Sequence, residues 1–224
     1  MDRFDILEIG AERQRVVVVD DVAADPDGLR VAAAAQDWGP ARHAYPGLRA
    51  DLPAGYWPDR EAMVCEAAAV LGLPADPVAL IDASFSLVTT PRAALSIGQR
   101  LPHCDSHEAG RLAFVHYLDP TAESGGTAFF RHRSTRFETV DRQRAAIYDG
   151  QLEAELRHGR PPAADYIGDD DPLFERIGAV PARYNRAVIY RSFALHSGVI
   201  PAGASLSPDP LDGRLTVTGF VSVG

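Results

Sequence analysis

Hydrophobic residues in the first third of the chain indicate one buried strand followed by two helices. Residues 15–20, RVVVVD, are apolar and β-branched over the length of a buried strand. Asp25 and Pro26 predict the start of the first helix, because aspartate caps free N–H groups and proline fits the first helical position. A second helix is predicted over residues 58–72, with acidic residues in its first turn. We therefore expect residues 1–80 to form an N-terminal helical portion that includes one strand.

From residue 82 onward the hydrophobic pattern changes to short strand-like runs separated by turns. The runs are ASFSLVTT, AALSIG, RLAFVHYL, TAFFRHR, AVIYRS, ALHSGVI and LTVTGFVSV. Several short strands without helices between them are typical of a sandwich or a barrel rather than of a doubly wound sheet. We therefore predict a mainly β fold with flanking helices, of the α+β class, in a single domain spanning residues 1–224.

Two longer segments are predicted to lie outside the strands. Residues 43–59 are rich in proline, glycine and aromatic residues, which is typical of an ordered surface loop. Residues 134–171 have the pattern of a helix followed by a polar loop, inserted between two strands. An insertion of this length is either a lid or binding loop over a site, or a helix that covers the core.

Composition and charge narrow the classes of partner. The 224 residues are 46% hydrophobic and 24% charged, with a net charge of −9, which argues against binding to nucleic acid or to anionic membranes. No apolar stretch reaches the length of a membrane span, and the N-terminus is acidic where a signal peptide needs a positive charge. Two cysteines, Cys65 and Cys104, are too few for a disulfide scaffold. We expect a cytoplasmic protein whose oligomeric state, homodimer included, stays open.

The chain contains no lysine, since all 22 of its basic residues are arginine. Mechanisms that need a Schiff-base lysine, a phosphate-binding loop lysine or a lysine general base are therefore excluded.

A metal site is the chemistry that the histidines indicate most strongly. His103 and Asp105 are two residues apart, and on an extended chain residues i and i+2 face the same side. Their side chains can therefore bind one metal ion, with His196 in the run ALHSGVI as the natural third ligand. Two histidines and one carboxylate on one face of an octahedron, with the opposite face open, are typical of non-haem Fe(II) oxygenases.

The other histidines offer weaker alternatives. His107 can pair with His103 at helical spacing, although Pro102 and Gly110 disfavour a helix there. His116 is expected on the strand face opposite Tyr117, as a surface or packing residue. The remaining histidines have no partner at a ligand spacing and are expected to be structural or solvated: His43, His132 and His158.

The order of motifs from residue 95 to residue 222 resembles the 2-oxoglutarate- and Fe(II)-dependent dioxygenase superfamily, in particular its prolyl-hydroxylase-like branch, which includes a small bacterial group without assigned substrates. The matching motifs are His103-Cys104-Asp105, Tyr117-Leu118-Asp119, Gly125-Gly126-Thr127-Ala128-Phe129, His196 and Arg214. The resemblance implies a double-stranded β-helix, or jelly roll, over residues 82–224.

The same resemblance implies the roles of individual residues. Fe(II) is expected on His103, Asp105 and His196, and 2-oxoglutarate on the metal. The far carboxylate of 2-oxoglutarate is expected on the cofactor-binding residues Arg214, Tyr117 and Thr216, because guanidinium offers a planar fork to a carboxylate. The interval from His196 to Arg214 is longer than is usual in the superfamily, so Arg131 is a second candidate for this cation and Arg191 a third.

The implied activity is hydroxylation of a small molecule, an amino acid or a peptide by dioxygen, with release of succinate and CO2. Halogenation is disfavoured because the carboxylate of Asp105 is present. There are two alternatives. One is a cupin-type metalloenzyme with a different metal, which does not use 2-oxoglutarate and takes His107 as a third histidine ligand; the other is a non-catalytic jelly-roll binding module. The arginines at 131, 133 and 136 form either an anion-binding cluster or a solvated basic face.

Overall fold

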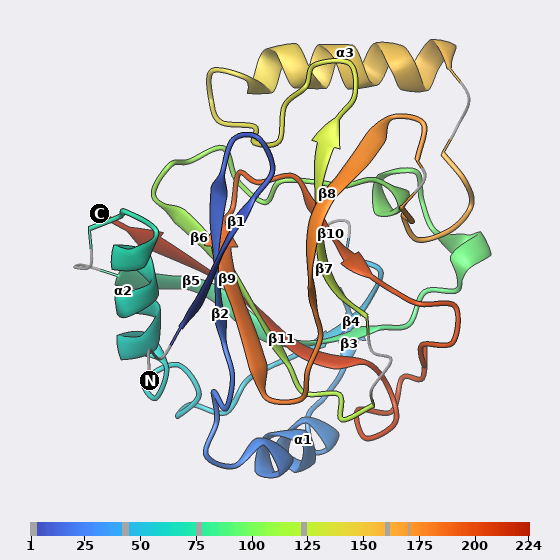
Figure 1. Cartoon of the computed structure of the whole chain (residues 1–224). Coiled ribbons are helices and arrows are strands. Elements are labelled where there is room, and N and C mark those ends of the chain that lie inside the picture. The colour runs from blue at the N-terminus through green and yellow to red at the C-terminus, as the bar shows by residue number, and fades with distance from the viewer. Residues whose placement is uncertain (1–3, 42–44, 75–77, 122–124, 160–161, 170) are drawn as a thin grey trace.

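The computed structural model describes residues 4–41, 45–74, 78–121, 125–159, 162–169 and 171–224 (Figure 1). It contains two antiparallel sheets and three α-helices. The predicted mainly β fold is therefore confirmed. None of the described helices is long and apolar enough to cross a membrane.

The two sheets differ in size. The larger has the strand order β1-β2-β9-β6-β11-β5-β4-β3, and the smaller has the order β10-β7-β8. In chain order the strands are β1 (Asp5–Ile9), β2 (Gln14–Val19), β3 (Gly39–Pro40), β4 (Gly47–Ala50), β5 (Val78–Val88), β6 (Arg111–Tyr117), β7 (Gly126–His132), β8 (Phe174–Pro181), β9 (Arg186–Arg191), β10 (His196–Val199) and β11 (Leu215–Val223).

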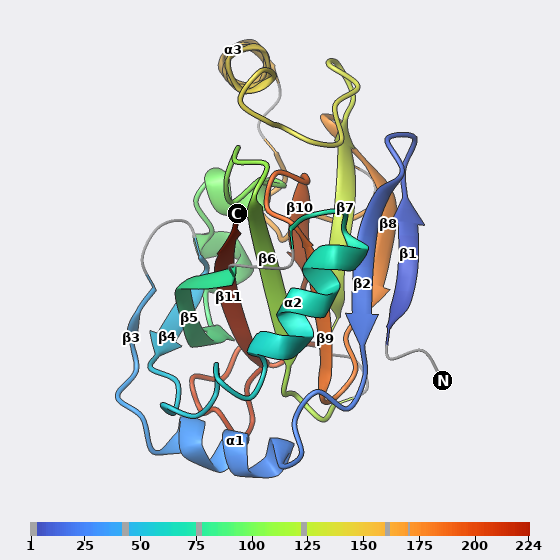
Figure 2. The same ribbon diagram turned by 90° about the vertical axis from the view of Figure 1, so that its left-hand side faces the viewer.

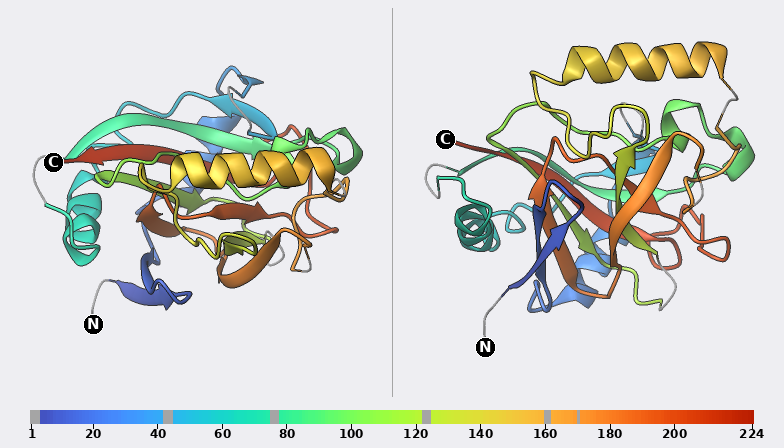
Figure 3. Two further views of the ribbon diagram at one scale, coloured as in Figure 1. Left: turned by 90° about the horizontal axis from the view of Figure 1, so that it is seen from above. Right: turned by 45° about the horizontal axis from the view of Figure 1, so that its top comes forward.

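The three helices lie outside the sheets (Figures 2 and 3). Helix α1 (Pro26–Ala34) begins as predicted, with the Asp25 side chain accepting a hydrogen bond from the Gly28 N–H. Helix α2 (Glu61–Val70) packs on the outer face of the larger sheet, where its buried side chains join the same core as Leu112 and Phe114. Helix α3 (Ala145–His158) belongs to the predicted insertion and crosses the ends of the strands.

The sequence-based expectations fail at several elements. The N-terminal helical portion is not confirmed, because β1, β2, β3 and β4 all belong to the larger sheet. Part of the predicted surface loop, Gly47–Ala50, is strand β4 paired with β5. The run AALSIG forms two short 3-10 turns instead of a strand, since only Leu95 of it is buried. Strand β8 was not expected at all.

Strand β6 shows how the larger sheet separates two environments. Its even-numbered residues Leu112 and Phe114 face α2, whereas Ala113 and Tyr117 belong to the cluster between the sheets. His116 lies on the α2 side, fully buried. Its prediction as a packing residue is confirmed, and its alternative as a surface residue is wrong.

His116 is held in its neutral form. Its Nδ1 accepts a hydrogen bond from the Tyr56 hydroxyl at 3.0 Å, and its Nε2 lies 3.1 Å from Asn185 Oδ1, which can only accept. Burial lowers the pKa of His116 to about 4. Folding therefore excludes a proton that the unfolded chain binds below its ordinary pKa of 6.5.

The free energy of unfolding is expected to fall as the pH drops from 6.5 towards 4, with His116 contributing up to about 3 kcal/mol of the loss. His116→Gln keeps the shape but removes the titration, so its stability should depend less steeply on pH over this range. Urea unfolding of both proteins at about pH 7 and about pH 4.5 measures the difference. Equal slopes in the two proteins would contradict this origin of acid sensitivity.

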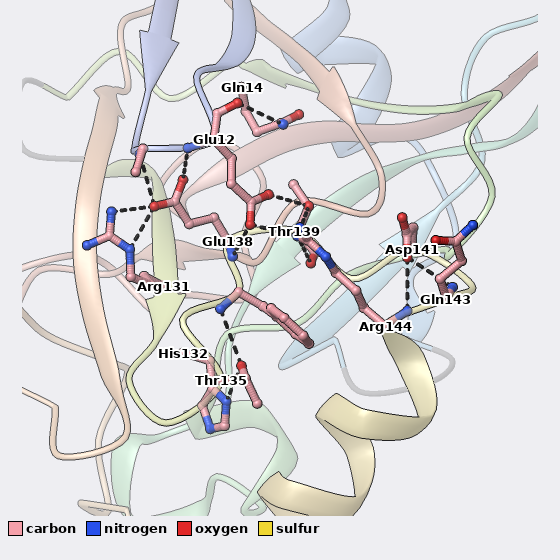
Figure 4. A network of polar contacts seen from close by, with 12 residues as sticks. Glu12, Gln14, Arg131, His132, Thr135, Glu138, Thr139, Asp141, Gln143 and Arg144 are labelled. Atoms are coloured by element: carbon pink, nitrogen blue, oxygen red, sulfur yellow. Dashed lines mark hydrogen bonds and ion pairs between the residues drawn. The ribbon is translucent and has the colours of Figure 1, made fainter.

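A buried carboxylate fastens the turn between β1 and β2 to the segment that leads into α3 (Figure 4). Glu138 accepts hydrogen bonds from the N–H groups of Ala11 at 3.0 Å and Glu12 at 2.9 Å, and from Arg131 Nε at 2.7 Å. The Glu138 side chain is 1% exposed and that of Arg131 is 13% exposed. Arg131 also binds Glu175 at 3.0 Å, so its guanidinium is neutralised within this network.

Glu138→Gln is expected to lower the free energy of unfolding by about 2 kcal/mol, because it leaves the buried Arg131 short of a counter-charge. Glu175→Gln is the matched control. The Glu175 side chain is 39% exposed, and its loss should cost less than about 1 kcal/mol. Urea midpoints of both variants test the ranking, and an equal cost would contradict it.

Candidate metal centre and cavity

The three predicted metal ligands are brought together by backbone pairing. His196 is the first residue of β10, and His103 forms an isolated antiparallel bridge with it, with both N–H···O distances at 2.9 Å. The Asp105 N–H donates to the Ser192 carbonyl at 2.8 Å, which places this carboxylate on the same side. The segment that contains His103 and Asp105 is thus bound along the chain that enters β10.

The side chains of these residues converge. One ligand atom from each of His103, Asp105 and His196 lies within 4.8 Å of the others. Asp105 Oδ1 is 3.5 Å from His103 Nε2, and Asp105 Oδ2 is 3.3 Å from His196 Nε2. His196 Nδ1 lies 2.9 Å from the Ala194 carbonyl and donates to it, so Nε2 presents its lone pair to the centre of the group.

The charges of the group suit metal binding at neutral pH. Burial lowers the pKa of His196 to about 4, against the opposing effect of Asp105. Burial tends to raise the pKa of Asp105, but the charge of His196 and the hydrogen bond and charge of His103 outweigh it and lower that pKa. Burial likewise opposes the Asp105 hydrogen bond and charge at His103, and the net effect raises the pKa of His103. A neutral His196 beside an ionised Asp105 provides two ligands in their metal-binding forms.

A cavity of about 630 Å³ opens beside this group, between the two sheets. This volume lies in the usual range for small-molecule sites. The ligand group forms one wall, and another is formed by Arg214, directly before β11, and by residues that alternate along β11. The lining residues on this second wall are Arg214, Thr216, Thr218 and Phe220.

Arg214 and Thr216 lie where a buried anion can be held. Arg214 is 5% exposed, and its Nη2 donates to the Gly126 carbonyl at 3.3 Å. The Thr216 hydroxyl donates to the Ser86 carbonyl at 3.3 Å. Tyr117 is not among the cavity-lining residues: its hydroxyl is 2.7 Å from Thr127 Oγ1, and the Arg214 guanidinium lies 5.9 Å from its ring centre. The Tyr117 ring therefore packs against the Arg214 guanidinium without lining the cavity.

Two polar residues of the cavity lining, Tyr45 and Arg49, come from a segment in which the sequence analysis places no site residue. Tyr45 has a buried hydroxyl that lies near the side chains of Thr216 and Ser86. Burial raises its pKa, and the nearby charge of Arg214 offsets part of the effect. Arg49 lies four residues further along the chain, on β4. Both fall in the segment predicted as a surface loop, and only the long-range pairing of β4 with β5 brings them to the cavity.

Other candidate residues lie elsewhere. His107 Nδ1 is 2.8 Å from the Val140 carbonyl, and this residue is outside the ligand group. Arg131 is bound to Glu138 and does not line the cavity. Arg191 donates to the backbone carbonyls of Ala109 and Leu71. The remaining histidines are accounted for as follows: His132 binds Thr135 and Glu155, His158 ends α3, and His43 lies outside the described residues.

The insertion contributes to the cavity wall through Tyr166, whose hydroxyl donates to the Thr90 carbonyl at 2.7 Å. Arg92 pairs with Asp165 beside it and donates to the Ile200 carbonyl at 2.9 Å. A role of this segment as a lid over the site remains a prediction.

Comparison with solved structures identifies proteins of similar fold. The chain matches 86 chains of solved structures. One is the non-heme alpha ketoglutarate dependent epimerase SnoN from nogalamycin biosynthesis (TM-score 0.52, 16% identity, 94% of this chain and 77% of that chain). Another is HygX from Streptomyces hygroscopicus with iron bound (TM-score 0.51, 12% identity, 94% and 83%). At these identities the likeness concerns the fold, and at that level the resemblance to the superfamily is confirmed.

Sequence comparison adds one match. Residues 2–221 match a family described as "Family of unknown function (DUF6445)". No curated protein sequence matches the chain.

Proposed function

The chain belongs to the family of unknown function DUF6445, and we propose that it is an Fe(II)- and 2-oxoglutarate-dependent oxygenase with a jelly-roll core that hydroxylates a small molecule. One observation supports this most directly. His103, Asp105 and His196 converge on one wall of a cavity whose other wall contains the buried cation Arg214. An oxygenase of this type needs a metal with open positions and a fixed cation for the far carboxylate of the co-substrate.

The donor set fits Fe(II). Two imidazole nitrogens and one carboxylate leave room for other ligands, and the three residues face a cavity rather than the packed core. The Ala194 carbonyl fixes the tautomer of His196, as is usual for metal-binding histidine. His103, Asp105 and His196 would therefore hold the metal.

The opposite wall fits 2-oxoglutarate. Arg214 would bind its far carboxylate, with the Tyr45 hydroxyl as a further donor and the Thr216 hydroxyl as another once it turns from the Ser86 carbonyl. Tyr117 would act through Arg214, by packing against its guanidinium.

Bound Fe(II) and 2-oxoglutarate supply the oxidising chemistry, in which dioxygen and 2-oxoglutarate yield succinate, CO2 and a hydroxylated substrate. The chain's own residues position the reactants and limit access of water, and Tyr166 of the insertion adds to the wall. SnoN, of similar fold, is described in complex with Fe3+ and alpha ketoglutarate, and is an epimerase. Hydroxylation rather than another oxidation is our proposal for this chain.

The cupin alternative needs a third histidine ligand. Among the described residues the ligand group holds two histidines, and His107 is bound to the Val140 carbonyl instead. A non-catalytic binding module does not need three metal ligands to converge, so their convergence disfavours that alternative.

Anaerobic titration of the protein with Fe(II) and 2-oxoglutarate tests the proposal. We expect a weak visible charge-transfer band that needs both additions, and succinate formation once oxygen is admitted. His107→Ala should keep the band and His103→Ala should lose it. Absence of both band and succinate in the wild-type protein would overturn the assignment, and metal binding without any binding of 2-oxoglutarate would favour the cupin alternative.

A further inference from the structure

Two arginines of the cavity have no place in the proposed metal and 2-oxoglutarate sites. Arg49 on β4 and Arg111 on β6 both line the cavity, on strands that flank β5 and β11. The Ser192 N–H donates to the Arg111 carbonyl, and the Ser192 carbonyl accepts from the Asp105 N–H, so Arg111 lies beside the metal-ligand segment. The charge of Arg49 also reaches Asp105, whose pKa it helps to lower.

Arg49 is incompletely satisfied within the protein. Its Nε is buried without a hydrogen-bond partner among the described residues. Its Nη1 lies 3.6 Å from Asp82 Oδ2, a long contact to a side chain that is 59% exposed. Its guanidinium sits over the Tyr45 ring at 5.1 Å, which holds the group toward the cavity. A guanidinium of this kind has donors left for a ligand.

The charges of the lining show which ligand they favour. The cavity is lined by three arginines and two aspartates. When Fe(II) and 2-oxoglutarate are bound, the two charges of the metal and the charge of Arg214 balance the dianion and Asp105. The other charged lining residues are then Arg49, Arg111 and Asp82, which leaves one positive charge for the substrate. This balance favours a monoanion over a neutral molecule, a cation or a phosphate dianion.

Apolar side chains lie beside these arginines. Phe220 on β11 pairs with Asp82 on β5 and with Ala113 on β6, and all three line the cavity. Val115, two residues further along β6, lines it too. A ligand at this end meets guanidinium groups and an apolar surface together.

We propose that the substrate is a small carboxylic acid with an apolar body, that Arg49 binds its carboxylate with Arg111 as a supporting cation, and that Phe220 contacts its body. The assignment of this ligand as the substrate rests on the proposed oxygenase function. The binding of a carboxylate at Arg49 is a separate and directly measurable property. Guanidinium recognises a carboxylate through two parallel N–H···O bonds, so the amide of the same acid should bind poorly.

The test compares 3-phenylpropanoate with its neutral analogue 3-phenylpropanamide, using calorimetry on protein saturated with Fe(II) and 2-oxoglutarate under anaerobic conditions. We expect the acid to bind at least about tenfold more tightly than the amide. Arg49→Gln should abolish this preference, Arg49→Lys should keep part of it, and Arg111→Gln should reduce it. Arg157→Gln, on the exposed face of α3, is the matched control and should leave the preference unchanged.

Three results would overturn the inference. These are equal or undetectable binding of acid and amide, survival of the full preference in Arg49→Gln, and tighter binding of phenyl phosphate than of the acid. The 2-oxoglutarate affinity of Arg49→Gln is measured in parallel, and its collapse would assign Arg49 to the co-substrate instead.

The two proposals fail in different ways. Absence of the charge-transfer band in the wild-type protein contradicts the oxygenase and with it the role of the acid as substrate. An intact band without carboxylate preference contradicts only the inference about Arg49. Thermal unfolding of each variant confirms that a loss of binding is not a loss of fold.

Discussion

Asp105→Ala is expected to lower Fe(II) affinity by well over 100-fold and to abolish succinate formation. Residues that merely support metal ligands typically contribute 10- to 100-fold to affinity, so a direct ligand should contribute more. Asp105 is the one carboxylate in the ligand group, and its two oxygens face the Nε2 atoms of His103 and His196. Its removal leaves two imidazoles and no negative charge to offset the metal.

Metal affinity is measured by equilibrium dialysis and succinate by chromatography after oxygen is admitted. Asp149→Ala is the control, because Asp149 is an exposed carboxylate near Cys104 but outside the ligand group. It should bind Fe(II) like the wild-type protein. Fe(II) binding by Asp105→Ala that equals the control would show that the metal is held elsewhere.

The metal-ligand candidates could be predicted because their signal is local. The i, i+2 spacing of His103 and Asp105 already places both side chains on one face of an extended segment, whatever that segment pairs with. His196 completes the group if its strand-like run, ALHSGVI, lies beside this segment. The structure adds the backbone bridge between His103 and His196 that brings the two segments into contact.

Two other residues of the cavity lining could not be predicted in the same way. Tyr45 and Arg49 belong to a segment rich in proline and glycine, and its strand character depends on pairing with β5 more than 30 residues later. Local propensity gives no indication of such a pairing, because strand formation depends on the neighbour. The run AALSIG shows the opposite error. Its apolar residues predict a strand, but only Leu95 is buried in the structure.

The choice between Arg214 and Arg131 also needed the structure. Both lie in or directly before strand-like runs, and the sequence distinguishes them only by motif order and by the interval from His196 to Arg214. The structure distinguishes the two arginines, because Glu138 neutralises the charge of Arg131 while it also binds the β1–β2 turn. Arg214 instead lines the cavity, where it donates to the Gly126 carbonyl and lies over the ring of Tyr117, which is outside the lining.

Arg214→Ala is therefore expected to raise the 2-oxoglutarate KM by about 100-fold or more while Fe(II) affinity stays within a few-fold of wild type. Truncating one partner of a buried, hydrogen-bonded charge pair typically costs 2–5 kcal/mol, and Arg214 is 5% exposed. Arg214 is not among the metal ligands, so the effect should be confined to the co-substrate. Titration of the charge-transfer band gives the 2-oxoglutarate affinity, and succinate formation gives the KM.

Two further variants, Arg214→Lys and Arg131→Gln, identify the cause of any loss of 2-oxoglutarate affinity in Arg214→Ala. Lysine keeps the charge but not the planar fork, so Arg214→Lys should recover part of the affinity, which a purely structural role of Arg214 would not explain. Arg131→Gln removes a cation of the Glu138 network and should lower stability without changing the 2-oxoglutarate KM below the melting temperature. An unchanged KM in Arg214→Ala together with a raised KM in Arg131→Gln would transfer the anchoring role to Arg131. Because Arg131 does not line the cavity, that outcome would also require the co-substrate to bind outside the space beside the metal ligands.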